Sequence, residues 1–278
     1  MLMLIATLLF SVMQLWVKQL NHIPFYELIF FRALISLVLC SITIKTQEGS
    51  FVGNRIDLLI GRGIFGMASL TCFFYALQHM PLGSLIVIVN IKPFLVLLWA
   101  SLFLKEKTWS FQWLLFGLCF IGIIWLKGVD QRIDQLALIA TVGAAFFASI
   151  AHTFVRKLKD SDQPTIILFY FTLVTVPIVA PFTIFNWIMP VGIDWIYCLG
   201  IGLITHFAQL CLTAAYQKEE VAIVSNMYYL GIVFAFTFGF LFFEETYSLE
   251  QVSAVGLIVI GMILNIFFTR RVKKQSHS

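Results

Sequence analysis

The chain has 278 residues, of which 60% are hydrophobic and 12% charged, and its formal net charge is +4. A soluble domain has about 25% charged residues, so this composition and a mean hydropathy of +0.96 exclude a water-soluble protein. Most of the basic residues lie in short segments beside apolar runs, which excludes nucleic-acid binding as the reason for the positive charge.

Ten apolar runs approach the length of about 20 residues that a membrane-spanning helix needs. We expect spans at residues 1–17, 25–44, 58–77, 81–104, 109–126, 135–155, 165–188, 195–217, 221–243 and 247–268. The first run has no basic segment before it and no cleavage site after it, so we interpret it as a retained span rather than a signal peptide. It is short for a span, which leaves open whether the true N-terminus lies upstream.

The two halves of the chain share one pattern under a shift of about 139 residues, which places Glu106 on Glu245. The shift also aligns Gln78 with Gln217, Gln112 with Gln251, Gly117 with Gly256 and Gly122 with Gly261. Each copy holds five spans, an odd number, so the copies must cross the bilayer in opposite senses. We therefore predict an all-α integral membrane protein of ten transmembrane helices in two inverted five-helix repeats. The first repeat is residues 1–126, the linker 127–134, the second repeat 135–268 and a basic cytoplasmic tail 269–278.

Lysine and arginine are distributed unequally between the two sets of loops. With the N-terminus inside, twelve of them lie in inner segments and three, Lys18, Lys127 and Arg132, in outer ones. Because basic residues collect on the cytoplasmic side, we predict a multi-pass protein of the cytoplasmic (inner) membrane with both termini in the cytoplasm.

Lys92 lies near the middle of the fourth span and is followed by Pro93. A cation at the bilayer midplane costs about 2.5–3.5 kcal/mol on insertion scales, so Lys92 should face a cavity or a partner. Two interpretations stay open with equal weight: Lys92 binds an anionic group of a substrate, or a carboxylate such as Glu27 neutralises it. Pro93 cannot donate to the carbonyl of Val89, which predicts a kink at this point.

A polar stripe follows one face of the eighth span. Its members are His206, Gln209, Thr213 and Gln217. In lipid such a stripe must face protein or water. It either lines a pathway, in which His206 would titrate near neutrality, or forms hydrogen bonds between helices. We favour the pathway, which makes His206 and Gln209 candidate substrate-binding residues beside Lys92.

The first span has a matching stripe, which adds Gln14 to the substrate-binding candidates. Its members are Thr7, Ser11, Gln14 and Lys18, of which the last three fall on Ser149, His152 and Arg156 after a one-residue adjustment. For His152 we prefer simple placement at the membrane interface.

The ninth span supplies the last candidates, Asn226, Tyr228 and Tyr229, which lie near its start but one to two turns deep. Cavity lining and interfacial anchoring of the tyrosines have equal weight here.

Glu27 and Arg32 are five positions apart in the second span, about 140° on a helix, and so are not an i,i+4 pair. We expect each to bond another helix, and we class Glu27, Arg32 and Pro93 as structural or coupling residues. Arg62 in the third span is expected to snorkel to the surface.

The sequence contains no recognisable metal or catalytic cluster. The five cysteines lie in apolar runs without a CxxC pair, so we expect no metal, no cofactor and no disulfide. Residues 61–66 match GxGxxG, but that motif requires a soluble βαβ unit, and we interpret its glycines as sites of close helix packing. We do not expect an enzyme.

Three stretches carry a resemblance to a known family: PFYELIFFRALISL at 24–37, KPFLVLLWASLFLKEK at 92–107 and LGIVFAFTFGFLFFEE at 230–245. Over nearly its whole length the chain resembles the EamA branch of the drug/metabolite transporter superfamily. The resemblance implies ten spans in two inverted repeats and movement of small metabolites by alternating access. Phe171 stands near the position equivalent to Arg32, and Ile232 matches Pro93, so the repeats have diverged.

We therefore expect a secondary transporter of a small organic metabolite, such as an amino acid or another carboxylate-bearing compound. A passive channel for small polar solutes is the alternative, and an integral-membrane enzyme is a weaker one. The expected partners are a small-molecule substrate and membrane lipid. The sequence leaves proton coupling, the direction of transport and the oligomeric state open.

Overall fold

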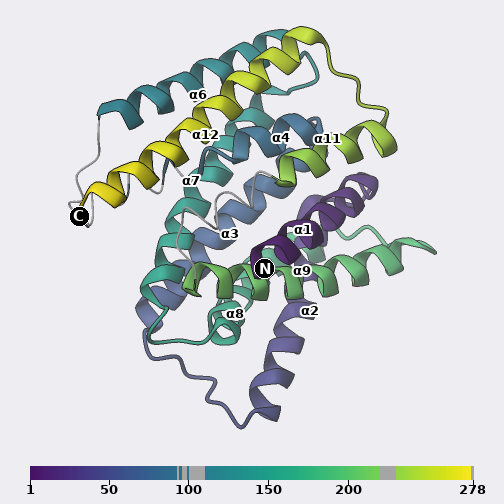
Figure 1. Ribbon diagram of the computed structural model, residues 1–278. Helices are drawn as coiled ribbons and strands as arrows, with labels where there is room; N and C mark the ends of the chain where they lie inside the picture. Colours follow the sequence, from purple (N-terminus) through teal and green to yellow (C-terminus); the bar gives the residue numbers. More distant parts are fainter. Residues whose placement is uncertain (93, 96–98, 100–109, 219–229, 277–278) are drawn as a thin grey trace.

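The computed structural model describes residues 1–92, 94–95, 99, 110–218 and 230–276, and within these ranges it contains ten helices and no strand. They are α1 (Leu2–Gln19), α2 (Phe25–Thr46), α3 (Ile56–His79), α4 (Leu82–Val89), α6 (Ser110–Val129), α7 (Gln135–Lys157), α8 (Pro164–Phe185), α9 (Asp194–Lys218), α11 (Leu230–Phe243) and α12 (Leu249–Ser276) (Figure 1). Seven are long and apolar enough to cross a membrane, and α11 and residues 249–265 form shorter apolar helices. The prediction of an all-α membrane protein is confirmed.

The helices begin at residues suited to that position. The Asp134 carboxylate caps α7 by accepting hydrogen bonds from the N–H groups of Leu136 and Ala137 at 2.9 and 3.0 Å, which satisfies two of its free donors. Pro164 occupies the first turn of α8, where a missing N–H costs no helical bond.

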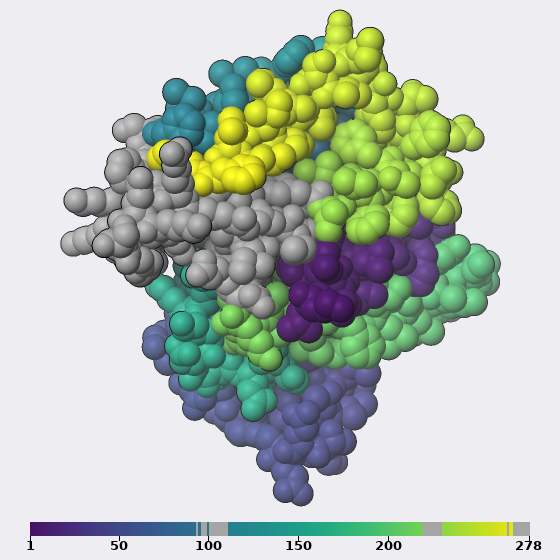
Figure 2. All heavy atoms as spheres, viewed as in Figure 1, coloured from purple at the N-terminus to yellow at the C-terminus, as the bar shows by residue number. Residues whose placement is uncertain are grey.

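The helices pack in pairs that follow the repeat. With a shift of about 139 residues, α1, α2, α3 and α6 correspond to α7, α8, α9 and α12. Helix α3 packs on α7 as α1 packs on α9, and α2 packs on α9 as α8 packs on α3. The pairs α2–α8 and α6–α12 join each helix to its own mate. In the space-filling view α1 is wedged between α9 and α11 (Figure 2). Such exchange of partners is the arrangement that a two-fold pseudo-axis between inverted repeats produces.

The α6–α12 pair shows this symmetry at the level of single residues. A Cβ atom added at Gly122 would lie 2.5 Å from Cγ1 of Ile258, and one added at Gly261 would lie 2.7 Å from Sγ of Cys119. Gly122 and Gly261 are repeat mates, and so are Cys119 and Ile258. The absence of side chains at the two glycines lets the helix backbones approach closely, as small residues do in membranes.

The loops sort into two opposite faces. On the first, which we call the Lys18 face, Lys18 Nζ donates to the carbonyl of Met80, and His22 Nε2 lies 3.0 Å from Oδ2 of Asp194. On the second, the Asp162 face, Oδ1 of Asp162 accepts a hydrogen bond from the N–H of Asn54 at 2.7 Å. The described loops thus alternate between the two faces, as a helix bundle that crosses the bilayer requires.

The structure differs from the expected spans at three places. The fourth span is interrupted, because α4 ends at Val89 and Asn90 and Ile91 form a turn. Helix α12 continues to Ser276 through the expected tail, since Lys, Arg and Gln are good helix formers and no Gly or Pro stops it. Arg62 does not snorkel, since it is only 3% exposed within the bundle.

Candidate functional site

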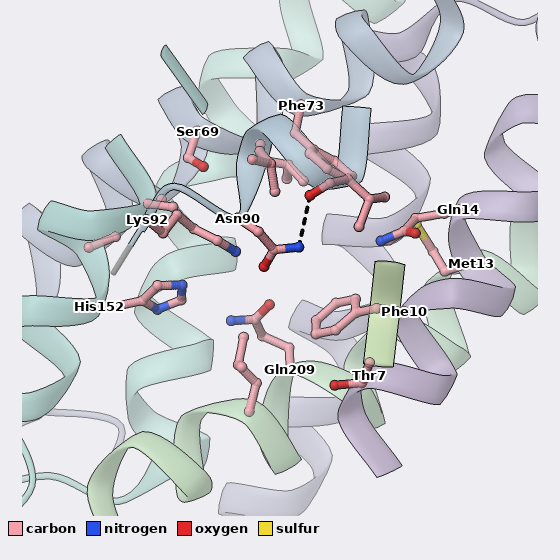
Figure 3. Close-up of a pocket in the computed structure, with 18 of the residues that line it drawn as sticks. Thr7, Phe10, Met13, Gln14, Ser69, Phe73, Asn90, Lys92, His152 and Gln209 are labelled. Carbon is pink, nitrogen blue, oxygen red and sulfur yellow. Dashed lines mark hydrogen bonds between the residues drawn. The ribbon is translucent and has the colours of Figure 1, made fainter. Parts of the chain in front are cut away.

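A cavity of about 150 Å³ lies between the two repeats. Helices α1 to α4 line it from the first repeat, and α7, α8, α9 and α11 from the second. Its polar lining consists of Thr7, Ser11, Gln14, Arg32, Arg62, Ser69, Asn90, Lys92, His152 and Gln209. In the close-up, Lys92, Asn90, Gln14, His152 and Gln209 surround one central space (Figure 3). Three of the predicted binding residues, Lys92, Gln209 and Gln14, are therefore brought together.

The break in the fourth span places Asn90 and Lys92 at the cavity. Asn90 Nδ2 donates to the carbonyl of Ile86 at 2.8 Å, and its backbone N–H is shared between the carbonyls of Ile86 and Val87. Lys92 is 9% exposed and lies three positions after Val89, the last residue of α4. The turn thus places Asn90 and Lys92 in the lining of the cavity.

Arg32 reaches the same cavity from α2. Its NH2 group donates to Oε1 of Gln209 at 3.5 Å, and its guanidinium lies 5.7 Å and 5.9 Å from the ring centroids of Phe74 and Phe171. The bond to Gln209 joins the repeats across the cavity, in agreement with the expectation that Arg32 bonds another helix.

Two basic residues at the cavity were placed elsewhere by the sequence analysis. Arg62 lies 4.5 Å from the Phe171 ring centroid, and His152, 8% exposed, stacks on Tyr216 at 4.4 Å. Both were assigned to the membrane interface from their nearness to a loop. The repeat pairing of His152 with Gln14 was the signal that could have placed it in the cavity.

The cationic side chains of the lining all belong to the first repeat. Arg32, Arg62 and Lys92 have Phe171, Ile201 and Gly231 as their repeat mates. Among the described lining residues there is no Asp or Glu. In the described lining the arginine and lysine residues therefore come from one side, from α2, α3 and the segment that follows α4.

Glu27 does not neutralise Lys92 in this structure. Its Oε2 accepts a hydrogen bond from the N–H of Ile188 at 3.1 Å, and its Oε1, also buried, has no hydrogen-bond partner among the described residues. Glu27 lies in the first turn of α2, beside the Lys18 face, whereas Lys92 lies at the cavity. The geometry therefore does not support the interpretation in which Glu27 pairs with Lys92.

His206 lies outside the lining of the cavity. Its Nδ1 is 2.9 Å from the hydroxyl oxygen of Ser36 on α2. Three residues rotate a helix by about 300°, so Gln209 and His206 are some 60° apart on α9, and that difference turns Gln209 to the cavity and His206 to α2. The position of His206 therefore favours the second interpretation given above, a hydrogen bond between helices.

Four candidates, Pro93, Asn226, Tyr228 and Tyr229, lie outside the described residues. Asn90 and Ser69, in contrast, line the cavity and were missed. Asn90 lies two positions before Lys92 in an otherwise apolar run, and that polar pair was the available signal. Ser69 donates to the carbonyl of Ala144 on α7, and a single serine in a membrane helix carries no comparable signal.

Comparison with known proteins agrees with this architecture. The EamA-like transporter family matches residues 1–127 and 135–267. The pseudopaline exporter CntI of Pseudomonas aeruginosa is 29% identical over 262 residues, which are 93% of this chain and 92% of the exporter. Solute carrier family 35 member G1 of Mus musculus is 28% identical over 92% of this chain and 75% of its own length. A riboflavin transporter of Brucella anthropi is 24% identical over 88% of each chain.

A solved crystal structure shares the fold. It covers 96% of this chain and 98% of its own with a TM-score of 0.67 at 18% identity. The matched family and these relatives are transporters and not enzymes. The protein is thus a multi-pass membrane protein, and it belongs to the EamA-like transporter family of the drug/metabolite transporter superfamily.

Proposed function

We propose that this chain is a secondary transporter that moves a small carboxylate-bearing metabolite, such as an amino acid, by alternating access. The observation that carries the proposal is the cavity between the repeats, in which three basic residues, Arg32, Arg62 and Lys92, line one space together with neutral polar side chains. Charged groups buried in a membrane protein are costly and mark substrate or ion pathways. A carboxylate would offset the positive charge when bound.

The neutral polar groups of the cavity suit the rest of such a substrate. Gln14, Asn90 and Gln209 present amide groups from three different elements, and each amide offers both donors and acceptors. The interruption of the fourth span at Asn90 supports the same function, because discontinuous helices form the substrate sites of many secondary transporters.

We also propose that the protein lies in the cytoplasmic membrane with the Asp162 face and both termini in the cytoplasm. The support is the excess of lysine and arginine in the segments that the sequence analysis assigns to the inner side. Three of these residues, Arg156, Lys157 and Lys159, precede Asp162 on the Asp162 face. The Lys18 face would then be the outer one. His206 packs against Ser36 and does not line the cavity, so the proposal includes no proton coupling through His206.

A thermal-shift screen of the purified protein tests the substrate class. Each carboxylate of a metabolite library is paired with its neutral primary amide, which lacks the negative charge. A ligand that binds the native state raises its melting temperature. We expect hits among the carboxylates and loss of the shift in their amides. Equal shifts for acids and amides, or hits confined to cations, would contradict the proposal.

The rival functions predict different behaviour in liposomes. A transporter gives saturable uptake that is stimulated by the same compound on the opposite side. A passive channel gives flux without such stimulation, and an enzyme consumes the compound without net movement.

A further inference from the structure

An ion pair joins the two repeats at the Lys18 face. Lys18, at the end of α1, is bonded to Oε1 of Glu245, which lies in the loop between α11 and α12. The side chains are only 16% and 8% exposed. Lys18 Nζ also donates to the carbonyl of Met80 at 3.1 Å, so the ammonium group is held by both repeats.

The Glu245 carboxylate is fixed from three sides. Besides Lys18, it accepts a hydrogen bond from the N–H of Leu82 at 3.0 Å and one from the hydroxyl of Tyr247 at 2.5 Å. Leu82 is the first residue of α4, so the negative charge lies at the positive end of the helix dipole. One carboxylate thereby connects α1, α4 and the α11–α12 loop.

A second pair of charges extends the network to the linker between the repeats. Arg132 Nε donates to Oδ1 of Asp130 at 2.9 Å, and its guanidinium lies 5.4 Å from the ring centroid of Tyr247. The other oxygen of Asp130 accepts a hydrogen bond from the hydroxyl of Ser84, in the first turn of α4. The linker and the α11–α12 loop thus both bind the beginning of α4.

Helix α4 links this network to the cavity. It has eight residues, about 12 Å at 1.5 Å per residue, and Asn90 and Lys92 follow its other end. A movement of the start of α4 would therefore move two lining residues of the cavity. Helix α4 therefore has one end in the ion-pair network and the other at the cavity, and a rigid element of this kind can couple two sites.

An ion pair such as Lys18–Glu245 can separate at small cost in free energy. The attraction within a buried ion pair is largely offset by the cost of removing both charges from water, so a pair that opens into water regains its hydration. The α6–α12 contact at Gly122 and Gly261 is different, because close apolar packing gains nothing from exposure. Of these two contacts between the repeats, the ion pair is the one that can open at small cost.

We propose that the Lys18–Glu245 pair is a latch that closes the Lys18 face and opens once in each transport cycle, while α4 transmits its state to the cavity. This proposal rests on the proposed transport function. The pair is intact in the structure, so the structure represents the latched state.

The test measures access to the cavity, which requires no known substrate. Ala148 lines the cavity and is partly buried, so an Ala148→Cys variant of the full chain reports the entry of a membrane-impermeant maleimide. Labelling is measured separately from each side of the membrane, and the chain without this change gives the background from the native cysteines. Lys18→Met and Glu245→Gln remove one charge each, and Lys18→Arg keeps a pair.

Lys127→Met is the matched control, because it also removes a cation from the Lys18 face. Lys127 donates to the carbonyl of Ile133, so its bond stays within the linker region. We expect labelling from the Lys18 face to rise about tenfold in both single variants, as a comparable shift of a two-state equilibrium produces. Lys18→Arg and Lys127→Met should both label like the native chain.

Unchanged labelling in folded Lys18→Met and Glu245→Gln protein would overturn the latch, and so would an equal rise in Lys127→Met. If one of the two single variants fails to fold, the other decides, and Lys18→Arg, which keeps a pair, must label like the native chain for the proposal to stand. Exchange measured in liposomes with the native chain separates the two proposals. If the native protein exchanges a carboxylate but labelling is unchanged in Lys18→Met and Glu245→Gln, the latch alone is refuted. If labelling changes in these variants but the native protein exchanges no carboxylate, the transport function is refuted.

Discussion

Gln78 and Gln217, one residue from each repeat, make the same pair of hydrogen bonds in opposite halves of the molecule. Gln78 Nε2 donates to the carbonyls of Leu20 and Ile23, and Gln217 Nε2 donates to those of Leu158 and Asp162. In each repeat the amide at the end of the third helix thus holds the turn that follows the first helix. The symmetry of the fold is carried by specific bonds as well as by hydrophobic packing.

Removal of either amide should destabilise the protein to a similar extent. In Gln78→Ala and Gln217→Ala, the carbonyls of a turn lose their donor, which costs about 1–3 kcal/mol where water cannot replace it. Unfolding by sodium dodecyl sulfate in mixed micelles measures the loss. Gln131→Ala, which removes an exposed amide with one long bond of 3.5 Å to Gly128, is the control and should stay within about 0.5 kcal/mol of the native protein. A large loss for only one of the two mates would contradict equivalent roles.

The glycines of α6 and α12 give a second matched test. Gly122→Ala and Gly261→Ala place a methyl group within 2.5–2.7 Å of Ile258 and Cys119, and we expect each to cost about 1–3 kcal/mol, as overpacking does. Gly117 and Gly256 are mates on the same two helices with no atom within 4 Å of an added Cβ. Alanine at those positions should be neutral or stabilising by up to about 1 kcal/mol, because it favours the helix. The same unfolding assay decides, and equal losses at all four positions would refute the close contact.

Stability should depend on pH through Glu245. Burial raises the pKa of this carboxyl group, but the charge of Lys18 and the hydrogen bonds from Lys18, Tyr247 and Leu82 outweigh it, so the pKa lies below its usual value of 4.5. A group with a lowered pKa contributes stability above its unfolded pKa and loses it as pH falls through the folded value. The free energy of unfolding of the native protein should therefore exceed that of Glu245→Gln at pH 7, by about 1.5–3 kcal/mol, the contribution of hydrogen bonds to a charged group.

That difference should shrink as the pH is lowered below 4.5 towards the folded pKa. Lys18, Arg132, Asp130 and Tyr247 are the other ionisable groups of this network, and all remain in both proteins. A difference that is constant down to pH 3 would show that the pair does not contribute through the charge of Glu245.

The proposed topology is tested from both sides of the membrane. Gln131 is exposed on the Lys18 face and Lys159 on the Asp162 face. A cysteine at position 131 should react with an impermeant maleimide in intact cells, whereas one at position 159 should react only in inverted vesicles. The opposite result would reverse the orientation and would place the termini outside.

The sequence predicted the fold through features that depend on local pattern. Runs of apolar residues and the alignment of Glu106, Gln112 and Gly122 with their mates sufficed for ten helices in inverted repeats. The interruption of the fourth span at Asn90 and Ile91 lies between Val89 and Pro93, where the missing N–H of Pro93 predicted a kink. The hydrogen bond from the Asn90 side chain to the carbonyl of Ile86 was not predicted, because a turn stabilised by an asparagine side chain has no signal in the sequence.

The candidate site could be predicted only in part, because the direction of a side chain is set by the packing of helices. Lys92 and Gln209 were identified from the cost of polar groups in lipid, and that argument applies equally to His206. It cannot distinguish a cavity from a hydroxyl on a neighbouring helix such as that of Ser36. Arg62 was missed for a related reason: a basic residue near a loop has the same sequence pattern whether it snorkels or turns into the bundle.

The measurement that tests the central claim most directly is counterflow in proteoliposomes, with the carboxylate that gives the largest thermal shift. Native protein should show uptake that is stimulated by the same compound on the opposite side. Lys92→Met should reduce the rate more than tenfold, since the loss of a buried charge contact costs at least 2 kcal/mol. His206→Gln should keep the rate within about twofold, because it alters the hydrogen bond to Ser36 and leaves the lining of the cavity unchanged. Native rates in folded Lys92→Met protein, or flux without stimulation in the native protein, would contradict the account.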